Sequence, residues 1–284
     1  MQGQAGPLAR LSFPLCISAR PANVSCQDME ACVKGIIVAA GLGQLCFPLT
    51  RDRTRLLTSN ADRPLLDYTI EAFARAGFEE VGVVLGHNGD ILQRYLEGSA
   101  RYGIAVYCLH NPIYWRGNAT ALYAAQPFVH GEPFVVALAD YAISAHALVS
   151  LLRGGWTSHV VGVRRWKRAR ASRGNATRVF LDEDSRVRDI SERLRRWNAV
   201  AAGVFLFQPR VFDGLGALLQ TSPDPCSVMC LVRGLLSHGY EVRSCDVSSA
   251  VRHELPAQDP LCYAGSILSI GLGSLGVRQE DYLA

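Results

Sequence analysis

Residues 33–64 read VKGIIVAAGLGQLCFPLTRDRTRLLTSNADRP and decide which fold we expect for the chain. They open with an apolar run, Ile36–Ala40, whose length and composition are typical of a buried parallel strand. Gly41 and Gly43 end this run and allow the backbone to turn sharply beside a ligand. The N–H groups exposed by such a turn attract anions, phosphates above all. The stretch therefore predicts a strand that leads into a phosphate-binding loop.

A basic segment and a helical pattern follow the glycine loop. Arg51, Arg53 and Arg55 add three guanidinium groups, which favour phosphate ligands. Residues 63–86, RPLLDYTIEAFARAGFEEVGVVLG, predict a helix over 65–76 and a strand over 81–85. Asp62 is the expected N-cap of the helix, and Gly77 is expected at its C-terminal end. Strand, glycine loop, helix and strand in this order begin a nucleotide-binding α/β domain.

The glycines alone do not define a nucleotide site. The G-x-G of residues 41–43 lacks the third glycine of a dinucleotide-binding fingerprint, and no acidic residue stands at a strand end about 20 residues further on. It is not a P-loop either, because no Gly-Lys-Ser/Thr follows. A plain strand-to-loop turn is therefore the alternative interpretation of these two glycines.

The rest of the chain alternates between strand and helix patterns and then changes character. Up to residue 140 the alternation predicts a three-layer α/β sandwich with a mostly parallel central sheet and right-handed crossovers. The second half is richer in strands and is expected to pack on the same sheet as a substrate-covering half. Strands are expected over 104–109, 134–138, 160–163, 178–181, 187–190, 200–207 and 240–247, and helices over 90–96, 118–125, 209–219 and 228–236.

The order of these motifs resembles the sugar-phosphate nucleotidyltransferases. VKGIIVAAGLG and FPLT are followed by NPIYWRGNATALYAA at 111–125, FVVALAD at 134–140 and AAGVFLF at 201–207. Residues 175–207 are most similar to inositol-1-phosphate cytidylyltransferases and to other polyol- or choline-phosphate cytidylyltransferases. The resemblance implies a Rossmann-like nucleotidyltransferase fold, related to glycosyltransferase-A, over residues 33–260. Residues 1–32 are then expected to be a disordered extension and residues 261–284 a C-terminal tail.

The resemblance also implies a reaction and a set of binding residues. A phosphate oxygen of a phosphorylated polyol, sugar or alcohol, or of a phosphonate, would attack the α-phosphorus of a nucleoside triphosphate, with CTP favoured, and pyrophosphate would leave. The loop would hold base and triphosphate, and the asparagine-containing segment would read base and ribose. These nucleotide-binding residues are Ala39, Ala40, Gly41, Leu42, Gly43, Asn111, Asn118 and Thr120. An asparagine offers a donor and an acceptor to a pyrimidine edge, although Asn111 before Pro112 is equally suited to form a turn.

Asp140 is the acidic residue with the clearest position. It directly follows the apolar run 134–139, at the strand end where ligands of open α/β sheets bind. The family carries a catalytic, metal-binding aspartate here, which implies that Asp140 binds Mg²⁺. Glu254 is the acid nearest to the family's second metal-binding position. The alternative for Asp140 is an N-cap of a helix near Ser144.

Several family positions are altered, and they support a second hypothesis. Arg55 stands where the family has a catalytic lysine, and residues 44–46 replace its T-R-L motif. Arg252 falls near the second metal position, and Glu192 and Ala201 replace a lysine and an aspartate of the inositol-type pattern. The chain could therefore be a catalytically inactive relative that binds a nucleotide or a partner protein.

Composition limits the remaining function classes. The net charge of +4 over 284 residues suits a phosphorylated small substrate and does not indicate a nucleic-acid partner. The basic cluster over 164–196 offers only Trp166 and the adjoining Trp197 as candidate stacking residues, which favours a solvated surface over a nucleic-acid groove. The sequence leaves a homo-oligomer open.

Cysteine spacing and hydropathy bear on location. The nine cysteines form no C-x-x-C pair and no metal-ligand spacing, which predicts reduced thiols and a cytoplasmic protein. No apolar stretch reaches the length that a membrane-spanning helix requires, so no membrane span is expected.

Overall fold

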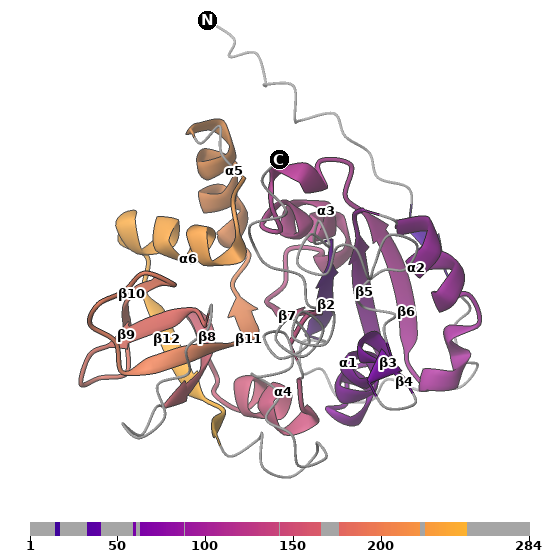
Figure 1. The fold of residues 1–284 in the computed structure, drawn as a ribbon, viewed down its shortest axis with the longest axis horizontal. Coiled ribbons are helices and arrows are strands. Elements are labelled where there is room, and N and C mark those ends of the chain that lie inside the picture. Colours follow the sequence, from indigo (N-terminus) through magenta and orange to yellow (C-terminus); the bar gives the residue numbers. More distant parts are fainter. Residues whose placement is uncertain are drawn as a thin grey trace, which may run out of the picture.

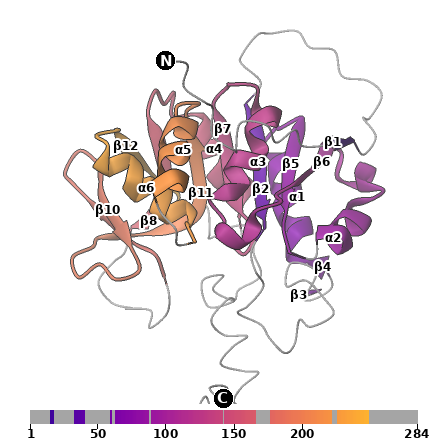
Figure 2. The same cartoon turned by 90° about the horizontal axis from the view of Figure 1, so that it is seen from above.

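The computed structural model describes residues 15–17, 33–40, 59–60, 63–87, 89–141, 143–165, 176–221 and 225–248. In these ranges one ten-stranded sheet carries helices on both faces (Figure 1). Figure 2 shows the same fold from above, where the helices overlap the strands of the sheet in projection. The three-layer α/β fold predicted from the sequence is therefore confirmed. Every helix in the described ranges is too short or too polar to reach across a lipid bilayer.

The sheet joins a parallel half to a mixed half. Its strands follow the order β1-β6-β5-β2-β7-β11-β8-β12, and β9 pairs with both β11 and β10. The β6, β5, β2 and β7 strands are parallel, β11 is antiparallel to β7 and β8, and β12 is parallel to β8. The strands are β1 (Leu15–Ile17), β2 (Lys34–Ala39), β5 (Glu80–Leu85), β6 (Ala105–His110), β7 (Phe134–Leu138), β8 (His159–Arg165), β9 (Arg178–Leu181), β10 (Val187–Ser191), β11 (Ala199–Phe207) and β12 (Val242–Asp246), with β3 (Ser59–Asn60) and β4 (Arg63–Pro64) in a separate ladder.

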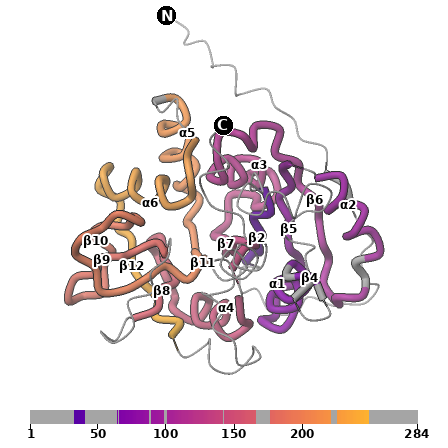
Figure 3. The backbone as a smooth tube through the Cα atoms, viewed as in Figure 1, coloured from indigo at the N-terminus to yellow at the C-terminus, as the bar shows by residue number. Residues whose placement is uncertain are grey.

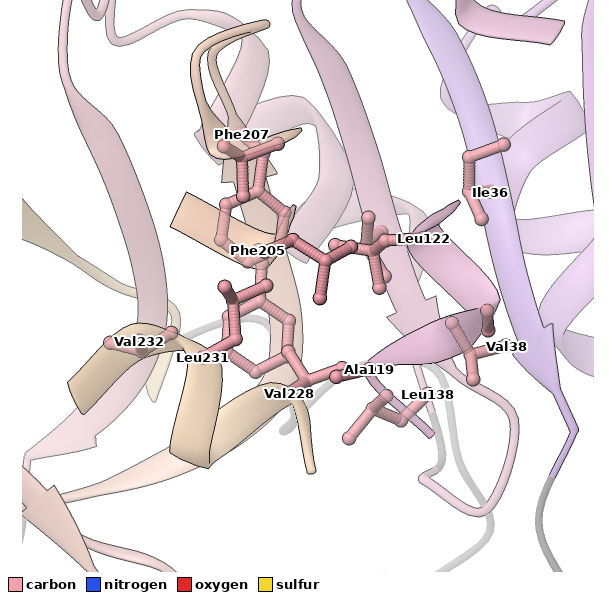
Figure 4. Close-up of a cluster of buried hydrophobic side chains, with 14 of the residues drawn as sticks. Ile36, Val38, Ala119, Leu122, Leu138, Phe205, Phe207, Val228, Leu231 and Val232 are labelled. Carbon is pink, nitrogen blue, oxygen red and sulfur yellow. The ribbon is translucent and has the colours of Figure 1, made fainter. Parts of the chain in front are cut away.

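Each face of the sheet has its own hydrophobic core, because successive side chains of a strand point to opposite faces. Ile36 and Val38 of β2 belong to the cluster beneath α3, α5 and α6, which Figure 4 shows around Phe205 and Leu122. Ile37 and Ala39 belong to the opposite cluster. The helices are α1 (Leu65–Arg75), α2 (Gly89–Leu96), α3 (Thr120–Val129), α4 (Ala145–Leu152), α5 (Val211–Thr221) and α6 (Val228–Ser237), with 3₁₀ turns η4 (Ser99–Tyr102) and η5 (Tyr114–Arg116).

The two halves of the chain occupy the two sides of the molecule. Figure 3 shows the indigo-to-magenta first half on one side and the orange-to-yellow second half on the other. Because β11 pairs with β7, the second half continues the same sheet, as the sequence predicts. Residues 182–185 form the turn of a hairpin: β9 and β10 pair antiparallel, and Ser185 has a φ of 61°.

Some local details differ from the prediction. Pro64, not Asp62, is the N-cap position of α1, whereas Gly77 follows the helix with a φ of 89°, as expected for its C-terminal end. Leu15–Ile17 pair with β6 although they fall within the predicted disordered extension. Three residues after Pro14 carry no pattern of their own, so only the free edge of β6 makes them a strand.

A buried carboxylate ties three elements of the first half together. Asp67 of α1 is 4% exposed and accepts hydrogen bonds from the hydroxyls of Tyr95, at 2.8 Å, and Tyr102. The guanidinium of Arg101 lies 3.8 Å from Asp67 and donates to the Tyr102 hydroxyl at 2.6 Å. Burial, followed by the hydrogen bond to Asp67, raises the pKa of Tyr102, which keeps its hydroxyl a donor.

We expect Tyr102→Phe to lower the free energy of unfolding by about 2 kcal/mol, because it leaves Asp67 and Arg101 each without one partner in a buried site. Urea unfolding monitored by circular dichroism measures this loss. Tyr95→Phe is the matched control and should cost less, since the Tyr95 side chain is only half-buried and water can replace its hydroxyl. Equal losses in the two variants would contradict the assigned role of burial.

A second buried polar group lies in β8. His159 is 1% exposed, and its Nδ1 accepts a hydrogen bond from the backbone N–H of Gln208 at 3.2 Å. Its Nε2 is buried and has no partner among the described residues. Burial and, to a smaller extent, the charge of Arg210 lower the pKa of His159 to about 4. The ring is therefore neutral in the folded protein at neutral pH.

This histidine should make the protein acid-sensitive. Because the unfolded chain protonates His159 near its ordinary pKa and the folded chain does so only near 4, its stabilising contribution is complete above about pH 6.5 and is lost as the pH falls toward 4. At pH 5 we expect a loss of about 2 kcal/mol, measured by urea unfolding against pH 7.5. His159→Gln should remove this part of the pH dependence, and substitution of the exposed His146 by Gln should not.

Candidate active site

The carboxyl ends of β2, β5 and β7 form one edge of the parallel half of the sheet. Val38 of β2 is paired with Leu138 of β7, and the N–H of Ala139 donates to the carbonyl of Val38 at 3.2 Å. Past this pair, Ala40 follows the end of β2, and Asp140 lies in the turn after β7, where the N–H of Tyr141 donates to the carbonyl of Leu138 at 3.1 Å. Asp140 therefore stands at the same edge of the sheet at which the chain leaves β2 toward the glycine loop.

The side chain of Asp140 is exposed at this edge, as a ligand-binding carboxylate requires. The alternative role as a helix N-cap is wrong. Ser144 is the N-cap of α4, and its Oγ accepts a hydrogen bond from the N–H of Ala147 at 3.2 Å. A short polar side chain next to the helix start outcompetes a carboxylate four residues earlier in the chain.

The backbone is closely packed where β2 and β5 end. Ala40 is 1% exposed, and Ala39 is also buried. A Cβ atom at Gly86 would lie 2.9 Å from Cα of Ala40 and 2.9 Å from Cβ of Tyr114, so only glycine fits there. The other predicted loop residues, Gly41, Leu42 and Gly43, lie outside the described residues, as do Arg55 and Glu254.

Asn111 and Thr120 lie together in the segment between β6 and α3. Asn111 is 3% exposed; its Nδ2 donates to Oγ1 of Thr120 at 2.8 Å, and its Oδ1 accepts from the N–H of Ile113 at 3.2 Å. Thr120 in turn donates to the carbonyl of Gly117 at 2.7 Å. The turn-forming alternative for Asn111 is confirmed, because its amide holds the loop closed.

Asn118 connects this loop to the second half of the chain. Its Oδ1 accepts a hydrogen bond from the N–H of Val228, the first residue of α6, at 2.8 Å. Next to it, the carbonyl of Cys226 accepts a hydrogen bond from the N–H of Ala119 at 3.0 Å. The N–H of Cys226 donates to the carbonyl of Arg116 at 2.7 Å. The predicted nucleotide-binding role of Asn111, Asn118 and Thr120 stays a prediction; what the structure adds is that all three order one loop.

Tyr141 is a residue of the site that sequence reasoning missed. Burial and the neighbouring carboxylate of Asp140 raise the pKa of Tyr141 to about 12, and a hydrogen bond with Thr177 opposes this shift. Its ring covers a bulge of β11, where Gly203 has a φ of 74° and a Cβ would overlap with the ring. The glycine inside a strand pattern was the available signal.

The second half carries an open groove of about 690 Å³ beside the β9–β10 hairpin. Its lining combines two arginines with three acidic residues, so its charge does not favour one class of ligand. The lining residues are Arg165, Phe180, Leu181, Asp182, Glu183, Asp184, Arg196 and Asn198.

The donors present at the sheet edge are compatible with magnesium. No cluster of three or more histidine, cysteine, aspartate or glutamate side chains occurs within the described ranges. Mg²⁺ does not need one, because it binds through one or two carboxylates together with substrate phosphates and water. The exposed carboxylate of Asp140 offers oxygen ligands of this kind, so the residues present fit the ion.

A mostly parallel sheet with an exposed aspartate at its carboxyl edge is typical of a Rossmann-like fold. Comparison with known proteins makes the class specific: residues 34–240 match the nucleotidyl transferase family, and the chain belongs to this family. The chain has 26% identity over 224 residues to the low-salt glycan biosynthesis nucleotidyltransferase Agl11 of Haloferax volcanii, covering 75% of this chain and 59% of that protein.

Other relatives carry names for different transfer activities. The bifunctional IPC transferase and DIPP synthase of Rubrobacter xylanophilus is 31% identical over 219 residues, which cover 77% of this chain and 48% of that protein. A glucose-1-phosphate thymidylyltransferase of Streptomyces antibioticus is 24% identical over 75% of this chain and 60% of that protein. The chain thus spans about half the length of these curated relatives.

The fold agrees with solved structures. The inositol-1-phosphate CTP transferase from T. maritima superposes with a TM-score of 0.65 at 20% sequence identity, covering 76% of this chain and 86% of the other. A UDP-glucose pyrophosphorylase in complex with UDP-glucose gives a TM-score of 0.62 at 18% identity, covering 75% of this chain and 90% of the other. These likenesses establish the nucleotidyltransferase fold.

Proposed function

We propose that this protein transfers a nucleoside monophosphate from a nucleoside triphosphate to a phosphorylated small molecule. An oxygen of the acceptor phosphate attacks the α-phosphorus, the bond to the β-phosphate oxygen breaks, and pyrophosphate leaves. The position of Asp140, exposed just past the end of β7 at the sheet edge where β2 also ends, is the observation that carries the proposal. The reaction requires positioning and charge neutralisation more than covalent help from the protein.

The residues divide this task among them. Asp140, with Glu254 as a second carboxylate, would hold Mg²⁺, which supplies neutralisation of the phosphate oxygens when bound. Arg55 would contribute a guanidinium to the α-phosphate. Backbone N–H groups from Ala39 to Gly43 would hold the triphosphate. Asn111, Asn118 and Thr120 would keep the neighbouring loop in the shape that receives base and ribose.

CTP is the nucleotide and a polyol phosphate the acceptor that we propose first. The relative with 31% identity is named as an IPC transferase, and this supports cytidylyl transfer to an inositol-type acceptor. Thymidylyl- and uridylyltransferases are also among the relatives, at 23–26% identity. A test must therefore compare nucleotides as well as acceptors.

The decisive experiment is a screen for pyrophosphate release. The full chain is mixed with Mg²⁺, one of CTP, UTP, dTTP or ATP, and one phosphorylated polyol, sugar, choline phosphate or phosphonate. Release should depend on one acceptor class, be fastest with CTP, and stop when a chelator removes the metal. No release with any pair, from protein that still binds nucleotide, would contradict catalysis.

That contrary outcome is the one expected from the second candidate function, a catalytically inactive relative. Gln44, Leu45, Cys46 and the arginine at position 55 depart from the family's motifs and favour it. Calorimetric titration with the same nucleotides separates the two candidates, because an inactive relative binds without turnover.

A further inference from the structure

Trp115 has no assigned role, yet its environment is unusual. Its side chain is 55% exposed, and it is the only large hydrophobic side chain exposed in the described part of the chain. It stands in η5, between Asn111 and Asn118, in the loop at the carboxyl edge of the sheet. A tryptophan kept in water beside a candidate nucleotide site raises the question of what covers it.

Trp115 belongs to a group of three rings that we call the aromatic shelf: His87, Tyr114 and Trp115. The Tyr114 and Trp115 rings meet edge to face with centroids 5.5 Å apart, and the His87 ring lies 6.0 Å from Tyr114. Tyr114 is half-buried and packs against the core beneath α3, so the shelf is anchored at one end and exposed at the other.

The anchored end of the shelf adjoins the start of the glycine loop. Gly86 separates Tyr114 from Ala40, and its missing side chain lets the two approach: a Cβ there would be 2.9 Å from each. Ala40 is the last described residue before Gly41. The shelf therefore flanks the place where we propose that the triphosphate lies.

The loop that carries Tyr114 and Trp115 is held in place by hydrogen bonds. The N–H of Ile113 is bound by Asn111, and the N–H groups of Arg116 and Gly117 donate to Ile113 and Tyr114 at 3.0 and 3.1 Å. The guanidinium of Arg116 donates to the carbonyl of Leu219 on α5 at 2.9 Å. Behind the loop, Ala119 is fully buried beside Val38 and Leu138 (Figure 4). A rigid surface loses little entropy when a ligand binds.

We propose that the aromatic shelf stacks on the base of the bound nucleotide and that Trp115 covers the face of the base. This inference rests on the proposed function and extends it. Stacking on an aromatic ring contributes about 1–3 kcal/mol per base and tolerates any base, since every base has a π-face. The shelf thus provides affinity for all nucleoside triphosphates and leaves the choice among them to hydrogen bonds.

The test combines Trp115→Ala with Trp115→Phe, which retains a ring but not the indole. Trp115→Ala should raise the Kd and KM of CTP, UTP and dTTP alike by about tenfold and leave kcat unchanged. Trp115→Phe should keep most of the affinity and lose the quenching of tryptophan fluorescence that we expect CTP to cause in the wild type. Trp156→Phe is the control. The indole N–H of Trp156 donates to the carbonyl of Leu151 in α4, so this variant should keep both the affinity and the quenching.

The outcomes separate the shelf from the proposed function. Unchanged affinity in Trp115→Ala, quenching that persists in Trp115→Phe, or a loss confined to one base would overturn the shelf alone. A wild-type protein that binds none of the nucleotides would overturn the shelf and the nucleotidyl transfer together. Turnover with unaltered nucleotide KM in Trp115→Ala would preserve the transfer reaction and reject the shelf.

Discussion

Asp140→Asn is expected to slow pyrophosphate release by about a thousandfold while the protein stays folded. The amide has the same shape as the carboxylate but lacks its charge, so it binds Mg²⁺ poorly and neutralises less of the charge that develops on the phosphates. A loss of roughly 4 kcal/mol of transition-state stabilisation corresponds to this factor. Initial rates of pyrophosphate release with the acceptor found in the screen measure it.

The control for this substitution is Asp213→Asn. Asp213 is exposed like Asp140 but lies in the first turn of α5, in the second half of the chain. The rate of pyrophosphate release by Asp213→Asn should stay within about a factor of two of the wild type, because this residue is exposed and lies outside the site. Full activity of Asp140→Asn would remove the basis of the proposed mechanism, and an unfolded variant would be recognised by circular dichroism and replaced by Asp140→Glu, which keeps the charge but displaces it.

The position of Asp140 was predictable because it depends only on periodicity. The run 134–139 reads as a buried strand, and the residue after a buried parallel strand must emerge at the carboxyl edge of the sheet. The same reasoning places Ala40 after β2 and Gly86 after β5. Parallel neighbours then bring all three to one edge, whichever side chains surround them.

The partners of polar side chains were not predictable in the same way. Asn111 and Thr120 are nine residues apart and form one hydrogen bond only because the intervening loop returns on itself. Asn118 finds its partner 110 residues away, at the start of α6. Local sequence patterns do not predict such contacts, since they depend on how the two halves of the sheet are joined.

The same limit explains why Tyr141 and β1 were missed. The ring of Tyr141 is placed by a bulge of β11, a strand that is antiparallel to β7 and follows it by 60 residues. The β1 strand exists through its pairing with β6. In both cases a distant strand determines the local structure, and propensity alone is too weak to indicate it.

Gly117 is where the loop of the aromatic shelf meets the segment before α6. Its φ of 96° and ψ of 165° belong to a region that is open essentially to glycine alone. A Cβ at this position would overlap with the carbonyl oxygen of Cys226, the same oxygen that accepts the hydrogen bond of Ala119 at 3.0 Å. An alanine must therefore strain its own backbone and also displace the contact between the two halves.

We expect Gly117→Ala to lower the free energy of unfolding by about 4 kcal/mol, of which 1–3 kcal/mol is backbone strain and the rest lost hydrogen bonds around Cys226. Gly77→Ala is the matched control: Gly77 has a similar φ of 89°, but a Cβ there meets no atom within 4 Å, so strain alone remains. Urea unfolding measures the loss of free energy of unfolding in each variant, and the difference between the two losses is the contribution of the contact with Cys226. Equal losses would mean that the segment before α6 moves aside freely and that its contact with Gly117 adds nothing to stability.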